Sequence, residues 1–561
     1  MSSRIQKTEE KNPYLFPKDV LHTALDILIS LYMLLILVVL PFFNRQGFLY
    51  IGTDKAYFFL QCSVRTGKVI IPVLVLYLAA KAAVFAWEKK QKSGEAGRKS
   101  TKSGSVRGKG IERGYGSITD AFALLYGISV LLSYVCSEYR DTALEGSQGW
   151  YMGLYAQVSL VAVYFLVSRL WKGHRFILAA ILPASAIVFI LGLLNRFDIY
   201  PIDMQLKNPA FISTIGNINW YCGYLVTVFF GGLGLFCLKD WKKRQYKMLF
   251  GIYIAIGFAA LVTQGSSSGI AAMLVVLPVM FSLSVEEGRR MQAFWEGMMI
   301  FSAVCMLFWE MQALNIGQMN YLEPAAMIFT HSIGAIILAV VSIIFMTIVS
   351  VQNKRKIYQA SRFKIVSKVL WAGMAGLFFA GIILLIVNTA SSGSISHALG
   401  LPEKNLITFT DRWGSNRGLI WKTGIACFVE QNFLHRLVGT GPDCMEAFLY
   451  TGGSAGLAAS VKEIYGNTRL TNAHNEWLTV LVDMGVMGLI GYAGMMSTAA
   501  FRFLKGRRTS VIAGACGFCV LAYIINNMFS FQQSMSTPTV FILLGVGENY
   551  LRRQGDEMEK V

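Results

Sequence analysis

The chain has 561 residues, of which 54% are apolar and only 15% are charged, and its mean hydropathy is +0.50. Soluble proteins average about 45–50% apolar and about 25% charged residues. The composition therefore excludes a series of soluble domains, and it excludes a disordered or collagenous chain. Nine scattered cysteines are too few for a disulfide scaffold. The class that remains is an all-α, polytopic membrane protein.

Long apolar runs follow one another along the chain. A helix needs about 20 apolar residues to cross the hydrocarbon core of a membrane. Fourteen runs approach this length, at 21–43, 69–87, 118–136, 150–168, 176–194, 218–237, 248–263, 269–284, 293–313, 323–350, 369–388, 475–499, 510–530 and 537–551. They predict about 12–14 transmembrane helices. The first run ends without a small-x-small cleavage site, so we expect a retained helix and not a signal peptide.

The net charge of +19 follows the topology of these runs. If the N-terminus lies inside, 36 of the 51 Lys and Arg residues fall in inside segments and 14 in outside segments. The positive-inside rule then places both termini in the cytoplasm. The charge is explained without a nucleic-acid partner, and we predict none. Residues 88–117, rich in Gly, Ser and Lys, suit a flexible cytoplasmic linker.

Residues 389–474 form a much longer outer loop than any other. Long loops in compact proteins are usually functional. We expect short helices within it, with Ser415 and Asn416 capping a helix that starts at Arg417, and a final helix from about Ala473. The chain thus divides into N-terminal helices (1–200), middle helices (201–388), the outer loop (389–474), and C-terminal helices with a short tail (475–561).

Motifs for metals and nucleotides are absent from the sequence. The six histidines show no metal-binding spacing, no Asp-x-Asp occurs, and no phosphate-binding GxxxxGK[ST] loop occurs. We expect no cofactor and no metal. Cys516 and Cys519 form a CxxC inside an apolar run, which favours packing over redox chemistry. The spacing leaves open whether Cys427 and Cys444 pair.

Three stretches resemble the O-antigen ligase and O-antigen polymerase family. They are Thr214-Ile215-Gly216-Asn217-Ile218-Asn219-Trp220-Tyr221, then Ser415-Asn416-Arg417-Gly418-Leu419-Ile420-Trp421-Lys422 with Gly439-Thr440-Gly441, then Thr471-Asn472-Ala473-His474-Asn475-Glu476-Trp477-Leu478 with Gly485 and Gly488. Their order around the outer loop matches the family over residues 200–550. The stretch 265–269 departs from it, since it lacks an Arg that the family often carries there. The helix pair 293–313 and 323–350 resembles an insertion.

The resemblance implies a membrane glycosyltransferase of the GT-C type. Such an enzyme passes a glycan from a polyprenyl-diphosphate carrier to an acceptor glycan or another cell-envelope hydroxyl, without a metal, at the outer face of a bacterial cytoplasmic membrane. It implies His474 as the base and Arg417 as the clamp of the diphosphate. Substrate-binding roles are implied for Arg412, Arg469, Asn217, Asn219, Asn475, Gly439 and Gly441.

Each of these residues also has a structural alternative. His474 suits a helix cap or the membrane interface, Arg417 suits a contact with membrane lipid headgroups, and Asn217 and Asn219 suit helix caps. As a base, His474 requires a neutral imidazole, which a helix N-terminus and a nearby Arg would favour. We expect Arg417 and His474 to line one outward-facing cavity.

The competing class is a transporter, such as a flippase for lipid-linked glycans. It would be expected to carry ionisable residues deep in several helices, whereas Asp483 is the one placed deep by the sequence. The single large outer loop also favours surface chemistry. The motifs do not distinguish a ligase from a polymerase, because the two differ in the acceptor.

Overall fold

The computed structural model describes residues 12–96, 116–314, 316, 327, 329–331, 333–401 and 407–558. Within them the protein is almost wholly helical, and eleven helices are long and apolar enough to cross a membrane. Two shorter apolar helices add to these, α5 (Leu154–Leu170) and α20 (Val511–Asn526). The prediction of an all-α, polytopic membrane protein is confirmed.

Each predicted apolar run coincides with a helix. In chain order the eleven lie in α1 (Leu15–Leu34), α2 (Ile51–Ala96), α3 (Ile118–Cys136), α6 (Arg175–Arg196), α7 (Ile218–Leu238), α8 (Arg244–Thr263), α9 (Ser267–Ser284), α10 (Gly288–Ala313), α12 (Gly334–Lys354), α13 (Ala360–Ala390) and α19 (Glu476–Lys505). The last predicted run lies in α21 (Thr537–Met558), which is not one of the eleven. A π-helix, η1 (Leu35–Val39), continues α1. The short elements η2 (Gly47–Tyr50), α4 (Arg140–Glu145) and η4 (Gly506–Arg508) lie between spans.

Helix α2 differs from its prediction. It has 46 residues, about 69 Å at 1.5 Å per residue, so it is far longer than a membrane is thick. It includes residues 88–96, which the sequence assigned to a flexible linker, and residues 97–115 of that linker lie outside the described residues. Most of residues 88–96 are Glu, Lys, Gln or Ala, which are good helix formers, so the composition did not reveal where the helix ends.

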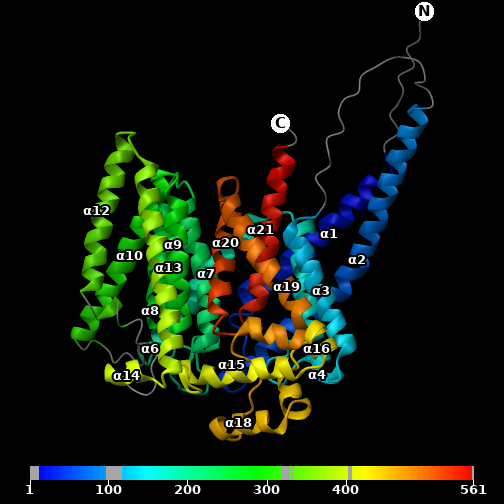
Figure 1. The fold of residues 1–561 in the computed structure, drawn as a ribbon. Coiled ribbons are helices and arrows are strands. Elements are labelled where there is room, and N and C mark those ends of the chain that lie inside the picture. The colour runs from blue at the N-terminus through cyan, green and yellow to red at the C-terminus, as the bar shows by residue number, and fades with distance from the viewer. Residues whose placement is uncertain are drawn as a thin grey trace, which may run out of the picture.

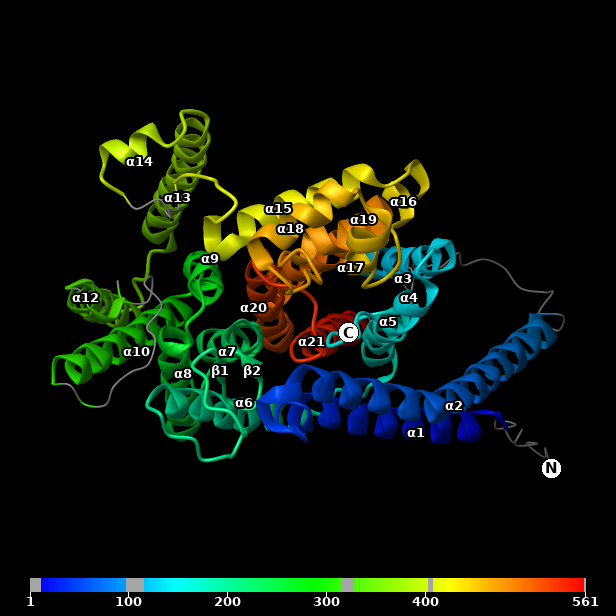
Figure 2. The same ribbon diagram turned by 90° about the horizontal axis from the view of Figure 1, so that it is seen from below.

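The spanning helices pack around α7, whose side chains are almost all buried. Helices α8, α9 and α20 surround it, and α19 packs on α3 (Figure 2). Added Cβ atoms at Gly491 and Gly494 would lie 2.6 Å from the backbone of Tyr126 and 2.3 Å from the ring of Phe122. Gly491 and Gly494 therefore allow α19 to pack closely on α3. At the edge of the molecule, α13 presents exposed apolar residues such as Leu377 and Phe378, which suit contact with lipid.

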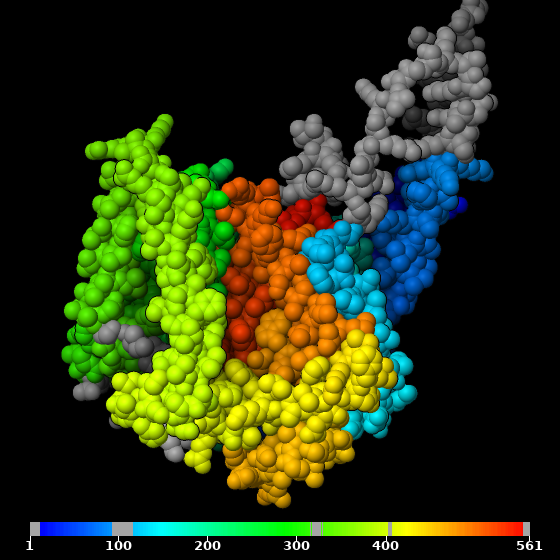
Figure 3. All heavy atoms as spheres, viewed as in Figure 1, coloured from blue at the N-terminus to red at the C-terminus, as the bar shows by residue number. Residues whose placement is uncertain are grey.

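The loop 389–474 folds into short helices, as predicted, and they cover one end of the bundle (Figures 1 and 3). They are α14 (Ser394–Ala398), α15 (Trp413–Glu430), α16 (Phe433–Val438), α17 (Met445–Ala447), the π-helix η3 (Phe448–Gly452) and α18 (Ala455–Tyr465). Their apolar side chains form a small core of their own, which Val482 joins to α19. At the opposite end lie the first turn of α1 and the last turn of α21 (Figure 1).

The cysteines that the sequence left open are free thiols. Cys427 and Cys444 are both buried and are not joined to each other, and Cys516 and Cys519 are buried in α20. An added Cβ at Gly231 of α7 would lie 2.4 Å from the sulfur of Cys519. The CxxC residues therefore pack between helices, as predicted.

Candidate functional site

Two asparagines shape the segment that carries His474. The Oδ1 atom of Asn472 accepts the backbone N–H of His474 at 3.0 Å, and Asn475 accepts that of Leu478 at 3.1 Å. Asn475 is thus the N-cap of α19, which begins at Glu476 and not at about Ala473 as predicted. His474 precedes the helix with a φ of +45°. His474 is therefore part of the turn before α19 and not of the helix itself.

The half-buried ring of His474 stands edge-on against Phe531, with 5.2 Å between ring centroids. Burial, and then the positive charge of Arg417, lowers the pKa of His474 to about 4. The pKa is lowered, as the sequence predicted, and desolvation is the largest cause. A neutral imidazole at physiological pH can accept a proton.

Arg417 begins the regular part of α15. Gly414, Ser415 and Asn416 before it have left-handed backbone conformations, and neither polar residue caps the helix as predicted. The guanidinium of Arg417 donates to the carbonyl oxygens of Gly414 at 3.0 Å and Phe529 at 3.1 Å. Its Nε atom is buried and has no hydrogen-bond partner among the described residues. One donor of this half-buried cation thus makes no hydrogen bond within the described residues.

The segment between α20 and α21 brings these two residues together. The guanidinium of Arg417 lies 5.9 Å from the ring centroid of Phe529, and His474 contacts the ring of Phe531, two residues further on. The charge of Arg417 acts directly on the pKa of His474. A half-buried cation and a histidine with a lowered pKa therefore share one site, although 56 residues separate them in the chain.

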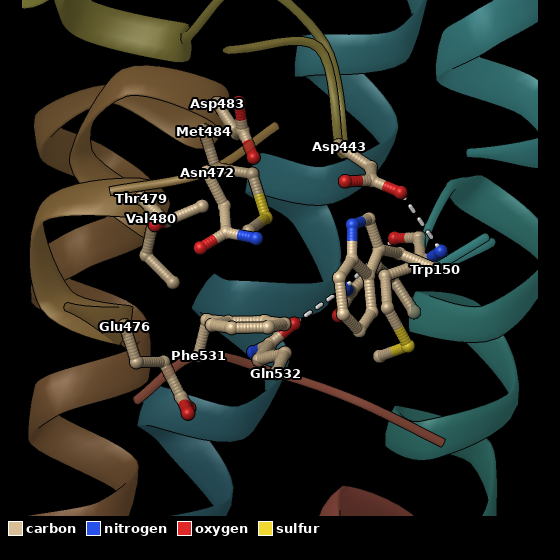
Figure 4. A pocket seen from close by; sticks show the side chains of 12 residues that line it. Trp150, Asp443, Asn472, Glu476, Thr479, Val480, Asp483, Met484, Phe531 and Gln532 are labelled. Atoms are coloured by element: carbon tan, nitrogen blue, oxygen red, sulfur yellow. Dashed lines mark hydrogen bonds between the residues drawn. The ribbon is translucent and has the colours of Figure 1, made fainter. Parts of the chain in front are cut away.

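A small cavity is lined by Phe531, the residue that His474 contacts (Figure 4). Its volume is about 20 Å³, enough for about one water molecule. Asp443, Glu476 and Asp483 line it, whereas Arg417 and His474 do not. The prediction that both residues line one outward-facing cavity is therefore not met by this cavity, and a glycan does not fit in it.

The carboxylates of the cavity have different surroundings. Asp443 accepts the backbone N–H groups of Ser147 at 2.8 Å and Met152 at 3.0 Å, and burial raises its pKa to about 7. Glu476 is fully buried and accepts hydrogen bonds from Tyr492, Tyr523 and Asn527. Glu476 is thus held by the helices that pack under the site.

An aromatic cluster that the sequence did not predict supports the His474 segment. The indole N–H of Trp150 donates to Oγ1 of Thr471 at 2.9 Å. The ring of Trp150 contacts Phe531 at 4.6 Å and Trp220 at 5.3 Å, both edge to face. Trp150 thereby links the His474 segment to the motif at 214–221. No motif marks Trp150, and only the fold shows its position.

Asn217 and Asn219 lie where a two-stranded sheet meets α7. Strands β1 (Phe211–Ile212) and β2 (Gly216–Asn217) are antiparallel, with Phe211 opposite Asn217. Asn217 accepts the backbone N–H of Asn219 at 2.9 Å as the N-cap of α7. Asn219 in turn accepts the hydroxyl of Ser266 at 2.8 Å. The helix-cap alternative is thus present for Asn217.

The stretch 265–269, which lacks the expected Arg, is approached by an arginine from another helix. Arg196 at the end of α6 donates to the carbonyl oxygens of Pro209 at 2.9 Å and Gln264 at 2.5 Å. It is 1% exposed. Arg196 therefore fixes this stretch to the backbone before β1.

The other two arginines lie at the surface of the loop. Arg412 is exposed at the N-cap of α15. Arg469 pairs with Glu446 at 2.8 Å, and its guanidinium lies 4.4 Å from the ring centroid of Tyr450. These contacts hold Arg469 to the 446–450 segment, and no contact joins it to His474 within the described part of the chain.

Gly439 and Gly441 anchor the loop to α19. The helix is interrupted at Gly485, whose φ is +65°, and this frees carbonyl groups one turn earlier. The N–H groups of Thr440 and Gly441 donate to the carbonyl oxygens of Val482 at 3.3 Å and Asp483 at 3.0 Å. A Cβ at Gly439 would lie 2.0 Å from the Asp483 oxygen. The structure places this turn in packing contact with α19 and not at an open surface.

No group of three His, Cys, Asp or Glu side chains that could hold a metal ion occurs in the ranges that the structure describes. The family described as O-antigen ligase matches residues 322–493. This stretch contains Arg417, His474 and the whole loop between them, so the family resemblance is confirmed there, whereas the motif at 214–221 lies outside the match. It supports a glycosyltransferase activity of ligase or polymerase type. No curated protein matches the chain.

Proposed function

We propose that this chain, whose residues 322–493 belong to the O-antigen ligase family, transfers a glycan from a polyprenyl-diphosphate carrier to an acceptor hydroxyl. The observation that carries the proposal is that a half-buried arginine, Arg417, and a histidine of lowered pKa, His474, both contact the segment 529–531. The loop 389–474 covers this site at one end of the bundle, which we assign to the outer face of the bacterial cytoplasmic membrane.

Arg417 acts on the leaving group. As the bond between the sugar's anomeric carbon and the diphosphate oxygen breaks, negative charge grows on the diphosphate. A guanidinium held by two backbone carbonyls is already oriented, so little reorganisation is needed at the moment of reaction. Its free Nε–H and its charge stabilise the departing polyprenyl diphosphate.

His474 acts on the acceptor. Its neutral imidazole takes the proton of the acceptor hydroxyl while that oxygen forms the new bond to the anomeric carbon. The nearby charge of Arg417 disfavours the resulting imidazolium, but bound diphosphate compensates for this charge. The base therefore becomes effective when the donor is in place.

The remaining predicted residues have supporting roles in this proposal. Asn219, with Ser266, and Asn475 lie on segments that lead into the site, where their amides contact sugar or phosphate oxygens. Arg412 and Arg469 are exposed enough to attract the anionic donor to the loop. Gly439 and Gly441 act indirectly, because they hold the loop on α19.

The experiment is an analysis of carrier-linked glycans in cells that lack the protein. Full-length polymer left on the carrier identifies a ligase, and single repeat units left on the carrier identify a polymerase. Either result supports the proposal. Donor that accumulates only at the inner face of the membrane identifies a transporter and overturns it, as does an unchanged glycan profile.

A further inference from the structure

A large groove lies at the end of the molecule opposite the candidate site. Helices α6, α7, α20 and α21 line it mainly with apolar side chains, and its volume is about 500 Å³. Pockets for organic ligands measure about 300–1,000 Å³. The groove and the candidate site lie at opposite ends of α20. Ser510, the N-cap of α20, lines the groove, and the C-terminal end of α20 leads to Phe529 in the candidate site. About 24 Å of helix separates the two regions.

Two cations stand at the mouth of this groove. Arg175 begins α6, Lys239 follows α7, and both are exposed. Neither forms an ion pair with a carboxylate in the described ranges, and the ammonium of Lys239 lies 4.6 Å from the ring centroid of Trp241. The groove thus combines apolar walls with uncompensated positive charge.

Several other arginines at this end of the bundle form ion pairs. Arg169 and Arg552 pair with Asp120, Arg502 pairs with Glu548, and Arg507 and Arg508 pair with Glu286. Carboxylates at this end thus pair with other arginines, whereas Arg553, whose charge acts on Tyr550 of the groove lining, adds a further cation beside the groove. The first turn of α20 adds backbone N–H groups at the same place.

We propose that the groove binds an anionic glycerophospholipid from the leaflet opposite the glycan-transfer site. Its acyl chains lie along Leu178, Leu182 and Val228, and its phosphate lies between Arg175 and Lys239. A headgroup that carries net negative charge is favoured over a zwitterionic one, because an ammonium group on the lipid would compete with these cations.

A second groove serves as an internal comparison. It lies between α1, α2 and α5, has the same volume of about 500 Å³, and has Lys68 as its one cation among the residues that line it. A negative headgroup should therefore strengthen lipid binding less in this second groove than in the first. Discrimination between headgroups should therefore depend on Arg175 and Lys239.

The test is native mass spectrometry of the full-length protein after exchange into vesicles with equal amounts of phosphatidylglycerol and phosphatidylethanolamine. The wild type should retain phosphatidylglycerol preferentially. Each basic residue near an anionic lipid changes binding about fivefold, so Arg175→Gln with Lys239→Gln should reduce this preference at least about tenfold. The matched control, Lys354→Gln with Arg355→Gln, removes two exposed charges away from the groove and should keep it.

A groove-filling variant separates the contribution of the acyl chains. Ala179 lines the groove and is exposed, so Ala179→Phe should reduce retention of both lipids without disturbing the core. Equal retention of the two lipids by the wild type would overturn the proposal. An unchanged preference in the charge variant, or retention of polyprenyl phosphate in place of phospholipid, would also overturn it.

Discussion

Replacing Arg417 with Lys separates the geometry of this side chain from its charge. Arg417 uses two nitrogens to hold the carbonyl oxygens of Gly414 and Phe529, and its Nε–H is free for the diphosphate. Lys keeps the charge but cannot hold both carbonyls and the substrate in one plane. Loss of one such donor costs about 2–4 kcal/mol in the transition state, so kcat should fall about 30- to 1,000-fold.

The charge of Arg417 should also affect how the transfer rate depends on pH. Because the charge of Arg417 lowers the pKa of His474, Arg417→Gln should raise that pKa, and activity should be lost at a higher pH as the medium is acidified. Arg417→Lys should leave the acid limb near its wild-type position. Burial is the larger cause of the shift, so the pKa in Arg417→Gln should stay below 6.5.

The assay is single-turnover transfer from a polyprenyl-diphosphate donor to its acceptor, with protein reconstituted in liposomes and rates measured across pH. Lys422→Gln, which removes an exposed cation paired with Asp411, is the control for a general loss of charge. A wild-type kcat in Arg417→Lys, together with an unmoved acid limb in Arg417→Gln, would refute the reasoning.

Three further changes test the surroundings of the site. Arg469→Gln removes an exposed ion pair, which is worth at most about 1 kcal/mol. The rate of glycan transfer should therefore change less than about fivefold, and a larger loss would place Arg469 at the substrate. Gly439→Ala puts a Cβ against the Asp483 carbonyl at a φ of +89°, and the backbone strain alone costs about 1–3 kcal/mol. Thermal unfolding of this variant should begin at a lower temperature, and an unchanged melting curve would contradict the packing role. Trp150→Phe removes the indole N–H that donates to Thr471, a hydrogen bond worth about 0.5–1.5 kcal/mol. The transfer rate should fall about 2- to 10-fold, with binding of the lipid-linked glycan unchanged. A wild-type rate would show that the His474 segment does not depend on this bond.

The membrane architecture was predictable because its physical signal is strong. Spans of about 20 apolar residues have few alternative structures, and each predicted run is a helix. The end of α2 was missed, since a basic, Ser- and Lys-containing stretch suits a helix as well as a linker. The start of α19 was placed three residues early, because the turn formed by Asn472 and Asn475 depends on local hydrogen bonds.

The candidate site was predictable only in part, because only some of its residues belong to a recognisable motif. His474 and Arg417 carry chemistry that a motif can mark, and both were identified from the sequence. Phe529 and Phe531 bring them together, but aromatic residues between two apolar helices give no signal of that role. The packing of Gly439 against Asp483, and of Gly485 against Leu437, was likewise hidden, because glycines suit a phosphate-binding turn and a close backbone contact equally well.

The most direct test of the account is to separate donor binding from transfer in His474→Ala. The lipid-linked donor should bind with wild-type affinity, since Arg417 and the segment 529–531 are unchanged. Single-turnover transfer should fall about 100- to 10,000-fold, the usual contribution of a general base, and the residual rate should lose its acid limb. A variant that binds donor and transfers it at the wild-type rate, with the same acid limb, would contradict the central claim.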